Sequence, residues 1–146
     1  MKKLLRYFLL TFGIQTCAYG AQMTELDVAK VLEIAGFHTK LVPIFTCLAK
    51  HESNYKPEAI NKRNKNKTTD SGLLQVNSIW LKACKMTQKQ LMNPTNNAKC
   101  ALKIYEEQGL NAWVTFKKFK QRCMDFKIKD YKPVLTNTLI HNNREI

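Results

Sequence analysis

The number of cysteines constrains the fold of this chain more than any other feature of its sequence. Five cysteines occur in 146 residues. Cys17 lies in an N-terminal segment that has the features of a removable export signal, which leaves Cys47, Cys84, Cys100 and Cys123. An even number of cysteines in an exported chain favours two disulfides, although sequence alone permits three pairings. No Cys-x-x-Cys or His-x-x-x-His spacing occurs, so we expect no zinc site, redox site or cofactor.

The first 20 residues have the pattern of a secretory signal. Lys2, Lys3 and Arg6 precede an apolar run over residues 7–14, and small residues follow near residue 20. The run is too short to span a bilayer comfortably. We therefore expect a secreted, extracellular protein without stable membrane insertion. Residues 21–146 are expected to form one domain, with a tail from about residue 132 that has no strong pattern.

The chain is strongly basic, which bears on its partners. Its formal net charge of +13 falls by the three basic residues of the signal to +10. Such a charge favours attraction to polyanions, and a bacterial envelope or a nucleic acid would both qualify. The lysines are not interleaved with aromatic residues along a strand, so we expect no nucleic-acid partner. Charge alone does not identify the partner, so an anionic bacterial surface stays one candidate; a monomer is expected.

Two amphipathic helices are expected before residue 55. Thr24 and Asp27 have the spacing of a capping box, and apolar residues then recur at helical spacing until Gly36. Pro43 suits the first position of a second helix. The apolar face of that helix also carries Glu52, so this carboxyl group is expected to point toward apolar side chains.

A small sheet and two more helices are expected further along the chain. Residues 73–79 predict a short strand behind a glycine. Asn93 followed by Pro94 predicts a third helix that ends at Gly109, and Asn111 is expected to cap a fourth. No internal repeat, linker or second domain is evident.

Glu52 and Asp70 are carboxylates in dissimilar sequence environments. Desolvation and the negative end of its helix should keep Glu52 protonated, as a proton donor requires. Polar neighbours should keep Asp70 ionised; these are Thr69, Ser71, Gln75 and Asn77. A protonated and an ionised carboxyl group are what hydrolysis of a sugar bond requires. His51 should diverge from Glu52 on the helix, so a surface or packing role is expected for it.

Four segments carry a resemblance to a known family: C-L-A-K-H-E-S-N-Y, T-T-D-S-G-L-L-Q-V-N-S, N-A-W-V and a final R-C. They resemble the chicken-type (C-type) lysozymes, and the likeness runs from about Thr24 to Cys123. It implies an α+β lysozyme-like fold, mainly helical, with a small antiparallel sheet beside the active-site cleft. It also implies a muramidase for defence or digestion. Such an enzyme cleaves the β-1,4 bonds between N-acetylmuramic acid and N-acetylglucosamine in peptidoglycan with retention, through Glu52 as acid and Asp70 as nucleophile.

The resemblance further implies substrate-binding residues and a disulfide pairing. The positions that line the saccharide cleft in the family correspond here to Asn61, Gln75, Asn77, Trp80, Ala112 and Trp113. The two tryptophans should contribute most, because sugars present apolar faces that pack on indole rings, and Trp113 could equally pack in the core. The implied disulfides are Cys47 with Cys123 and Cys84 with Cys100.

The chain departs from the family pattern in three respects. Two of the usual four disulfides are absent, and both cysteines of each are missing. One of them would join the first helix to the tail, and Leu26 stands at the position of its first cysteine. Lower stability than in the family is therefore expected. One extra residue separates the two carboxylates, most easily placed in the turn 62–67. No acidic residue occurs over residues 88–99, so calcium is not expected.

Two other functions remain open at this stage. Bacterial lytic transglycosylases share a Glu-Ser pattern that Tyr55, Pro57 and Ala59 also fit, and they release an anhydro-sugar through the glutamate alone. The pair Cys47 and Cys123 favours the lysozyme interpretation. A secreted cationic protein that keeps the fold but binds the wall by charge alone is the second alternative.

Overall fold

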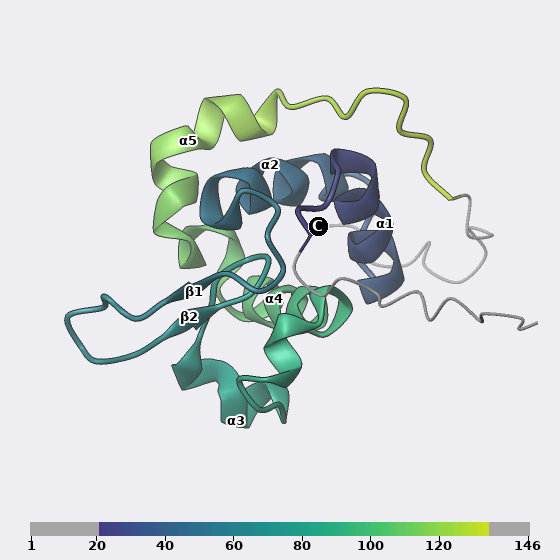
Figure 1. The fold of residues 1–146 in the computed structure, drawn as a ribbon. Helices are drawn as coiled ribbons and strands as arrows, with labels where there is room; N and C mark the ends of the chain where they lie inside the picture. The colour runs from purple at the N-terminus through teal and green to yellow at the C-terminus, as the bar shows by residue number, and fades with distance from the viewer. Residues whose placement is uncertain (1–20, 135–146) are drawn as a thin grey trace, which may run out of the picture.

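The structure is a computed structural model that describes residues 21–134. In chain order its elements are α1 (Glu25–Ala35), α2 (Val42–Ser53), β1 (Ile60–Asn61), β2 (Asp70–Ser71), β3 (Val76–Asn77), η1 (Ser78–Trp80), α3 (Leu81–Cys84), η2 (Gln90–Met92), α4 (Pro94–Gln108), η3 (Gly109–Ala112) and α5 (Val114–Met124). The hairpin of β1 and β2 projects to one side of the helices (Figure 1). The expected signal, residues 1–20, and most of the expected tail lie outside the described residues.

The first two helices form as the sequence predicts. The Thr24 hydroxyl accepts a hydrogen bond from the Asp27 amide at 3.2 Å, and the Asp27 carboxylate accepts one from the Thr24 amide at 3.1 Å. This capping box begins α1, and Gly36 ends it in the left-handed region with φ 98°. In α2, Phe45 and Leu48 are fully buried. The core therefore forms on the face of α2 that also carries Glu52.

The sheet is smaller than the apolar run 73–79 suggests, so that prediction is wrong for most of its length. Three two-residue strands pair antiparallel in the order β1-β2-β3, and residues 72–75 form a turn. Leu73 and Leu74 are both fully buried. Strand geometry would send neighbouring side chains to opposite faces, whereas this turn directs both into the core.

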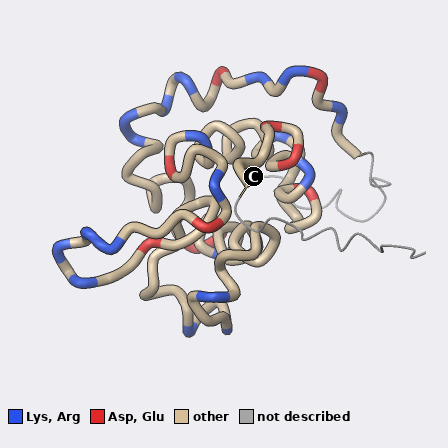
Figure 2. The backbone as a smooth tube through the Cα atoms, in the orientation of Figure 1, with Lys and Arg blue, Asp and Glu red and all other residues tan. Residues whose placement is uncertain are grey.

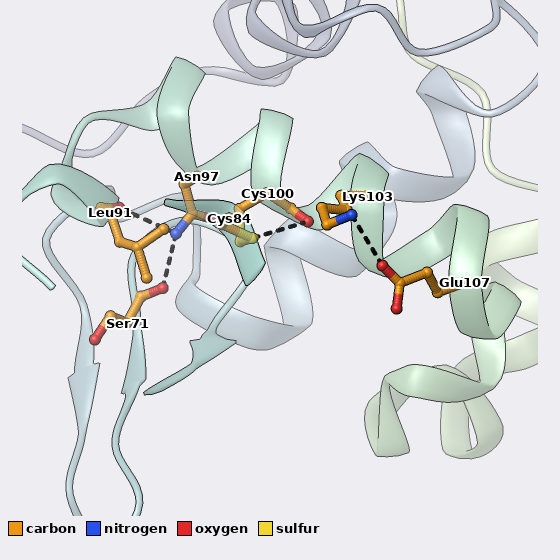
Figure 3. Close-up of a disulfide and its surroundings, with 7 residues drawn as sticks. All are labelled: Ser71, Cys84, Leu91, Asn97, Cys100, Lys103 and Glu107. Carbon is orange, nitrogen blue, oxygen red and sulfur yellow. Dashed lines mark hydrogen bonds and ion pairs between the residues drawn. A yellow bond between two sulfur atoms is a disulfide. The ribbon is translucent and has the colours of Figure 1, made fainter. Parts of the chain in front are cut away.

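A buried asparagine on α4 holds that turn. The Asn97 side chain accepts a hydrogen bond from the Leu74 amide at 2.8 Å. It donates to the carbonyl oxygens of Ser71 at 2.8 Å and Leu91 at 3.0 Å (Figure 3). A side chain at Gly72 would collide with Asn97 and with the Leu91 carbonyl. Asn97 therefore fixes the sheet against the helical part of the molecule.

Helix α4 follows its prediction, and α5 begins later than predicted. Asn93 caps α4 through a hydrogen bond from the Asn96 amide to its side chain. The predicted cap by Asn111 is wrong, because that residue lies in η3 and Trp113 occupies the N-cap position of α5 without a side-chain bond. As a result, the residue at the start of α5 is Trp113, which is buried in the core.

Two disulfides connect the helices. Cys47 of α2 pairs with Cys123 of α5, with a Cα–Cα distance of 5.2 Å, and Cys84 of α3 pairs with Cys100 of α4 at 5.5 Å (Figure 3). These are the pairs that the family resemblance implies.

After α5, residues 125–134 run back across the molecule toward α1 (Figure 1). Within residues 21–134, no helix has both the length and the apolar character needed to cross a membrane.

Candidate active site

A cleft of about 700 Å³ lies between the sheet and the helices. Its size is typical of small-molecule sites. All eight residues predicted from the sequence as catalytic or substrate-binding line it: Glu52, Asn61, Asp70, Gln75, Asn77, Trp80, Ala112 and Trp113. The lining also includes residues that the sequence reasoning missed, among them Asn64, Lys65, Asn66, Thr68 and Thr115.

Asp70 is held by three side-chain amides. Asn77 donates to Asp70 Oδ1 at 2.6 Å, and Asn64 and Asn61 donate to Oδ2 at 2.9 and 3.2 Å. The strand register explains two of these bonds, because Asn61 of β1 and Asn77 of β3 both lie opposite Asp70 of β2. Donors of this kind stabilise the ionised carboxylate.

The predicted donors to Asp70 are therefore only partly right. Asn77 donates as expected, whereas the Gln75 amide donates to the carbonyl oxygens of Ala59 and Gly72. Among the described residues, neither Thr69 nor Ser71 has a hydrogen bond to the Asp70 side chain. The prediction for Thr69 and Ser71 was wrong because it relied on proximity in sequence, whereas neighbouring residues on a strand point to opposite faces. The spacing Asn61-x-x-Asn64 before Asp70 is the signal that could have revealed the missed donor.

Glu52 lies in an environment of opposite character. The pKa of Glu52, at the C-terminal end of α2, is raised to about 7; burial is the largest cause, and the charge of Asp70 contributes to the rise. A hydrogen bond with the Thr115 side chain acts in the opposite direction and lowers the pKa. Glu52 is therefore substantially protonated near neutral pH, which a proton donor to a leaving oxygen requires.

The two tryptophans differ in their degree of burial. The Trp113 indole is buried, donates to the Leu74 carbonyl oxygen at 3.0 Å and meets the Phe45 ring edge-to-face at 5.2 Å. Trp113 is thus part of the core and also a wall of the cleft. Trp80, at the end of η1, is only partly buried and leaves ring surface open to the cleft.

His51 lies outside the cleft. Its ring stacks on Phe119 of α5 at a centroid distance of 3.8 Å, and it is absent from the cleft lining. Burial, followed by the charges of Arg122, Lys50 and Lys118, lowers its pKa. Cys47, His51 and Cys123 lie within 4.8 Å of one another, but the two cysteines form a disulfide and offer no thiolate to a metal.

The arrangement joins a protonated carboxyl group, an ionised carboxylate and an aromatic ring in one open cleft. A carbohydrate can enter such a cleft, receive a proton at a bridging oxygen from one side and meet a negative charge from the other. This is the chemical capacity of the site, built from α2, the sheet and the η3–α5 junction.

Comparisons with known proteins agree with this fold. Residues 21–132 match the C-type lysozyme/alpha-lactalbumin family. The tracheal isozyme of lysozyme C from Bos taurus is 31% identical over 146 residues, which cover 90% of this chain and 96% of that protein. Lysozyme c-1 from Anopheles gambiae is 34% identical over 115 residues, covering 71% and 81%.

A solved structure shows the same fold. The crystal structure of a lysozyme from Litopenaeus vannamei superposes with a TM-score of 0.58 at 22% identity, covering 70% of this chain and 97% of that one. The predicted α+β lysozyme-like fold, mainly helical with a small antiparallel sheet, is confirmed.

Proposed function

Because the chain belongs to the C-type lysozyme/alpha-lactalbumin family, we propose that it is a glycoside hydrolase of the lysozyme class that cleaves peptidoglycan. The bond cleaved is the β-1,4 linkage between N-acetylmuramic acid and N-acetylglucosamine. The protein acts after secretion, outside the cell, as a monomer on bacterial walls. The net charge of +10 that remains from +13 without the three basic residues of the signal supports attraction to an anionic wall.

The reaction proceeds in two steps with retention. Glu52 donates its proton to the bridging oxygen as the bond to the anomeric carbon breaks, and the Asp70 carboxylate bonds to that carbon. Glu52, now ionised, takes a proton from water while the water oxygen displaces Asp70. The enzyme returns to its starting state, and one water has been added across the glycosidic bond.

The observation that carries this proposal is the contrast between the two carboxyl environments. Burial raises the pKa of Glu52, whereas Asp70 accepts hydrogen bonds from three side-chain amides. The substrate-binding roles of Asn61, Gln75, Asn77, Trp80, Ala112 and Trp113 are part of the proposal, with the open ring of Trp80 as the sugar platform.

Peptidoglycan digestion followed by mass analysis tests the function. Glu52→Gln is expected to lower kcat by roughly 10²–10⁴-fold, since it removes the general acid. Asp70→Asn should also be strongly impaired, with ordinary reducing ends in the residual product. Glu106→Gln, an exposed change on α4 outside the cleft, is the matched control and should retain activity.

The same experiment separates the alternatives. Products lighter by one water, together with an active Asp70→Asn variant, would identify a lytic transglycosylase instead. Wall clearing that survives Glu52→Gln unchanged would identify a cationic binding protein.

A further inference from the structure

The loop between β1 and β2 carries a concentration of positive charge. Its four cations are Lys62, Arg63, Lys65 and Lys67, all exposed, and no acidic residue lies between Asn61 and Asp70. Figure 2 shows this charge at the end of the hairpin that projects from the molecule. The extra residue in this turn, noted in the sequence, falls within the same basic segment.

These cations are not used in ion pairs within the described structure. Over residues 21–134 there is one salt bridge, which joins Lys103 Nζ to Glu107 Oε1 on α4 at 3.0 Å. The loop cations are therefore available to a ligand. Four like charges in six residues also repel one another, and an anion bound beside them would relieve that repulsion.

One of the four cations faces the cleft. Lys65 lines it together with Glu52 and Asp70, and within residues 21–134 it is the only Lys or Arg that does so. An ionised Asp70 repels any negatively charged group that enters the cleft. Lys65 is placed to offset that repulsion for an anionic substrate, whereas a neutral substrate gains nothing from its charge.

The backbone around Lys65 is anchored on both sides. The Asn64 amide on one side donates to Asp70 and to the Thr68 hydroxyl at 3.2 Å. The Asn66 side chain on the other side accepts bonds from the Thr68 hydroxyl at 2.7 Å and the Thr68 amide at 3.2 Å. These hydrogen bonds connect the loop to Asp70, so the position of the Lys65 backbone beside the cleft is fixed.

The charge continues beyond the cleft. A second hollow of about 600 Å³ is lined by Ile60, Asn61, Lys62 and Arg63, and Asn61 also lines the main cleft. A glycan bound in the cleft can therefore place a substituent beside further cations on the same hairpin.

From this placement we infer that Lys65 determines specificity for glycans whose sugars carry carboxylates, over neutral glycans such as chitin. The inference rests on the proposed function, because it concerns the substrate of the same cleft. In a peptide-free glycan, the carboxylate is that of the lactyl group of N-acetylmuramic acid. In a peptide-bearing glycan, it is a carboxylate of the attached peptide. Lys62 and Arg63 extend the positive surface toward the attached group.

The test compares Lys65→Met with the matched control Lys99→Met, an exposed lysine of α4 that does not line the cleft. Three substrates of equal sugar length are used: a peptide-free peptidoglycan oligosaccharide, the same oligosaccharide bearing its peptides, and a chitin oligosaccharide. Lys65→Met is expected to lower the ratio of kcat/KM for the carboxylate-bearing to the neutral substrate by about three- to tenfold, mainly through KM. Lys99→Met should leave that ratio unchanged.

The two carboxylate sources give different results. A loss of preference with the peptide-free substrate assigns the lactyl carboxylate, and a loss only with the peptide-bearing substrate assigns the peptide. An unchanged ratio for Lys65→Met with both substrates, or an equal loss on chitin, overturns the inference.

A binding measurement keeps the inference separate from the proposed function. Binding of the same three glycans is measured by calorimetry in Glu52→Gln and in Glu52→Gln with Lys65→Met. If the wild type hydrolyses none of the glycans, the proposed hydrolase function fails, but a carboxylate preference that disappears with Lys65 still supports this inference. Equal binding of charged and neutral glycans to Glu52→Gln contradicts it.

Discussion

The pKa of Glu52 reflects three opposing influences, which are burial and the neighbours Asp70 and Thr115. Burial dominates and raises its pKa, the charge of Asp70 adds to the rise, and Thr115 lowers it through a hydrogen bond, with a pKa of about 7 as the result. As a general acid, Glu52 acts only while protonated. Activity should therefore fall as pH rises through about 7, on the alkaline side of the pH profile.

Replacing Thr115 with valine tests this balance, because valine keeps the shape of the side chain and removes the hydroxyl. Losing the bond that lowers the pKa should raise the pKa of Glu52, so the alkaline limb of kcat/KM should move to higher pH. The pH profiles of wild type and Thr115→Val on a soluble glycan oligomer measure this. Thr95→Val, on α4 and outside the cleft, is the control. An alkaline limb that stays in place or moves to lower pH contradicts the assignment of Thr115.

At the residue scale, the sequence predicted the environment of Glu52 better than that of Asp70. Helical spacing places Glu52 on the face of Phe45 and Leu48, and the structure buries that face. The donors to Asp70 come instead from neighbouring strands, and two of the three depend on the sheet register. Sequence adjacency carries no information about register when the strands are two residues long.

At the element scale, helices with clear end signals were predictable. Thr24, Gly36, Pro43 and Asn93 act locally, and each marks a helix end in the structure. Asn111 carries the same type of local signal, but η3 intervenes and delays α5. Tertiary contacts of Trp113 decide that position, because its indole is bonded to the Leu74 carbonyl oxygen. A local cap signal cannot encode such a distant contact.

Residues 125–134, which follow α5, form a strap that is fastened to α1. The Tyr131 hydroxyl donates to Glu33 Oε1 at 2.7 Å, the Val134 amide donates to the same oxygen at 3.0 Å, and Ile128 is buried. The family's first-helix bridge to the tail is absent here, with Leu26 at the cysteine position. The strap links the same helix to the segment after α5 without a covalent bond.

Tyr131→Phe should therefore destabilise the protein. Removing a hydrogen bond to a partly exposed carboxylate should lower the free energy of unfolding by about 1 kcal/mol, as measured by urea denaturation. Tyr105→Phe is a matched control, because no hydrogen bond of the Tyr105 hydroxyl is found among residues 21–134. Equal stability of the two variants would mean that the strap adds nothing through this bond.

At the scale of the whole molecule, the resemblance to the C-type lysozymes predicted the architecture. Composition and periodicity alone could not predict it. Periodicity gives separate helices, but the disulfide pairing and the cleft between sheet and helices depend on how those helices assemble. Of the three pairings that sequence permits, the structure has the one in which Cys47 of α2 joins Cys123 of α5, on which α2 packs, and Cys84 of α3 joins Cys100 of α4. The two disulfides then join α2, which carries Glu52, to α5, and α3 to α4.

The two disulfides should contribute unequally to stability. The sequence separation is 76 residues between Cys47 and Cys123 and 16 between Cys84 and Cys100. Loop-closure entropy in the unfolded chain grows with the logarithm of this separation, so the longer loop should contribute about 1.4 kcal/mol more. Cys47 and Cys123 are both buried, and the cavities left by their loss act in the same direction.

Paired alanine variants measure this difference, because each removes one whole bridge and leaves no stray thiol. Urea unfolding of Cys47→Ala/Cys123→Ala should give a lower free energy of unfolding than Cys84→Ala/Cys100→Ala, by at least about 1 kcal/mol. Each double variant serves as the control for the other, since both lose two cysteines and one bridge. If the two lose equal stability, or if the shorter loop proves the more stabilising, contacts in the folded state outweigh chain entropy. The packing around Cys84 and Cys100, rather than the length of chain that their bridge encloses, would then account for their contribution.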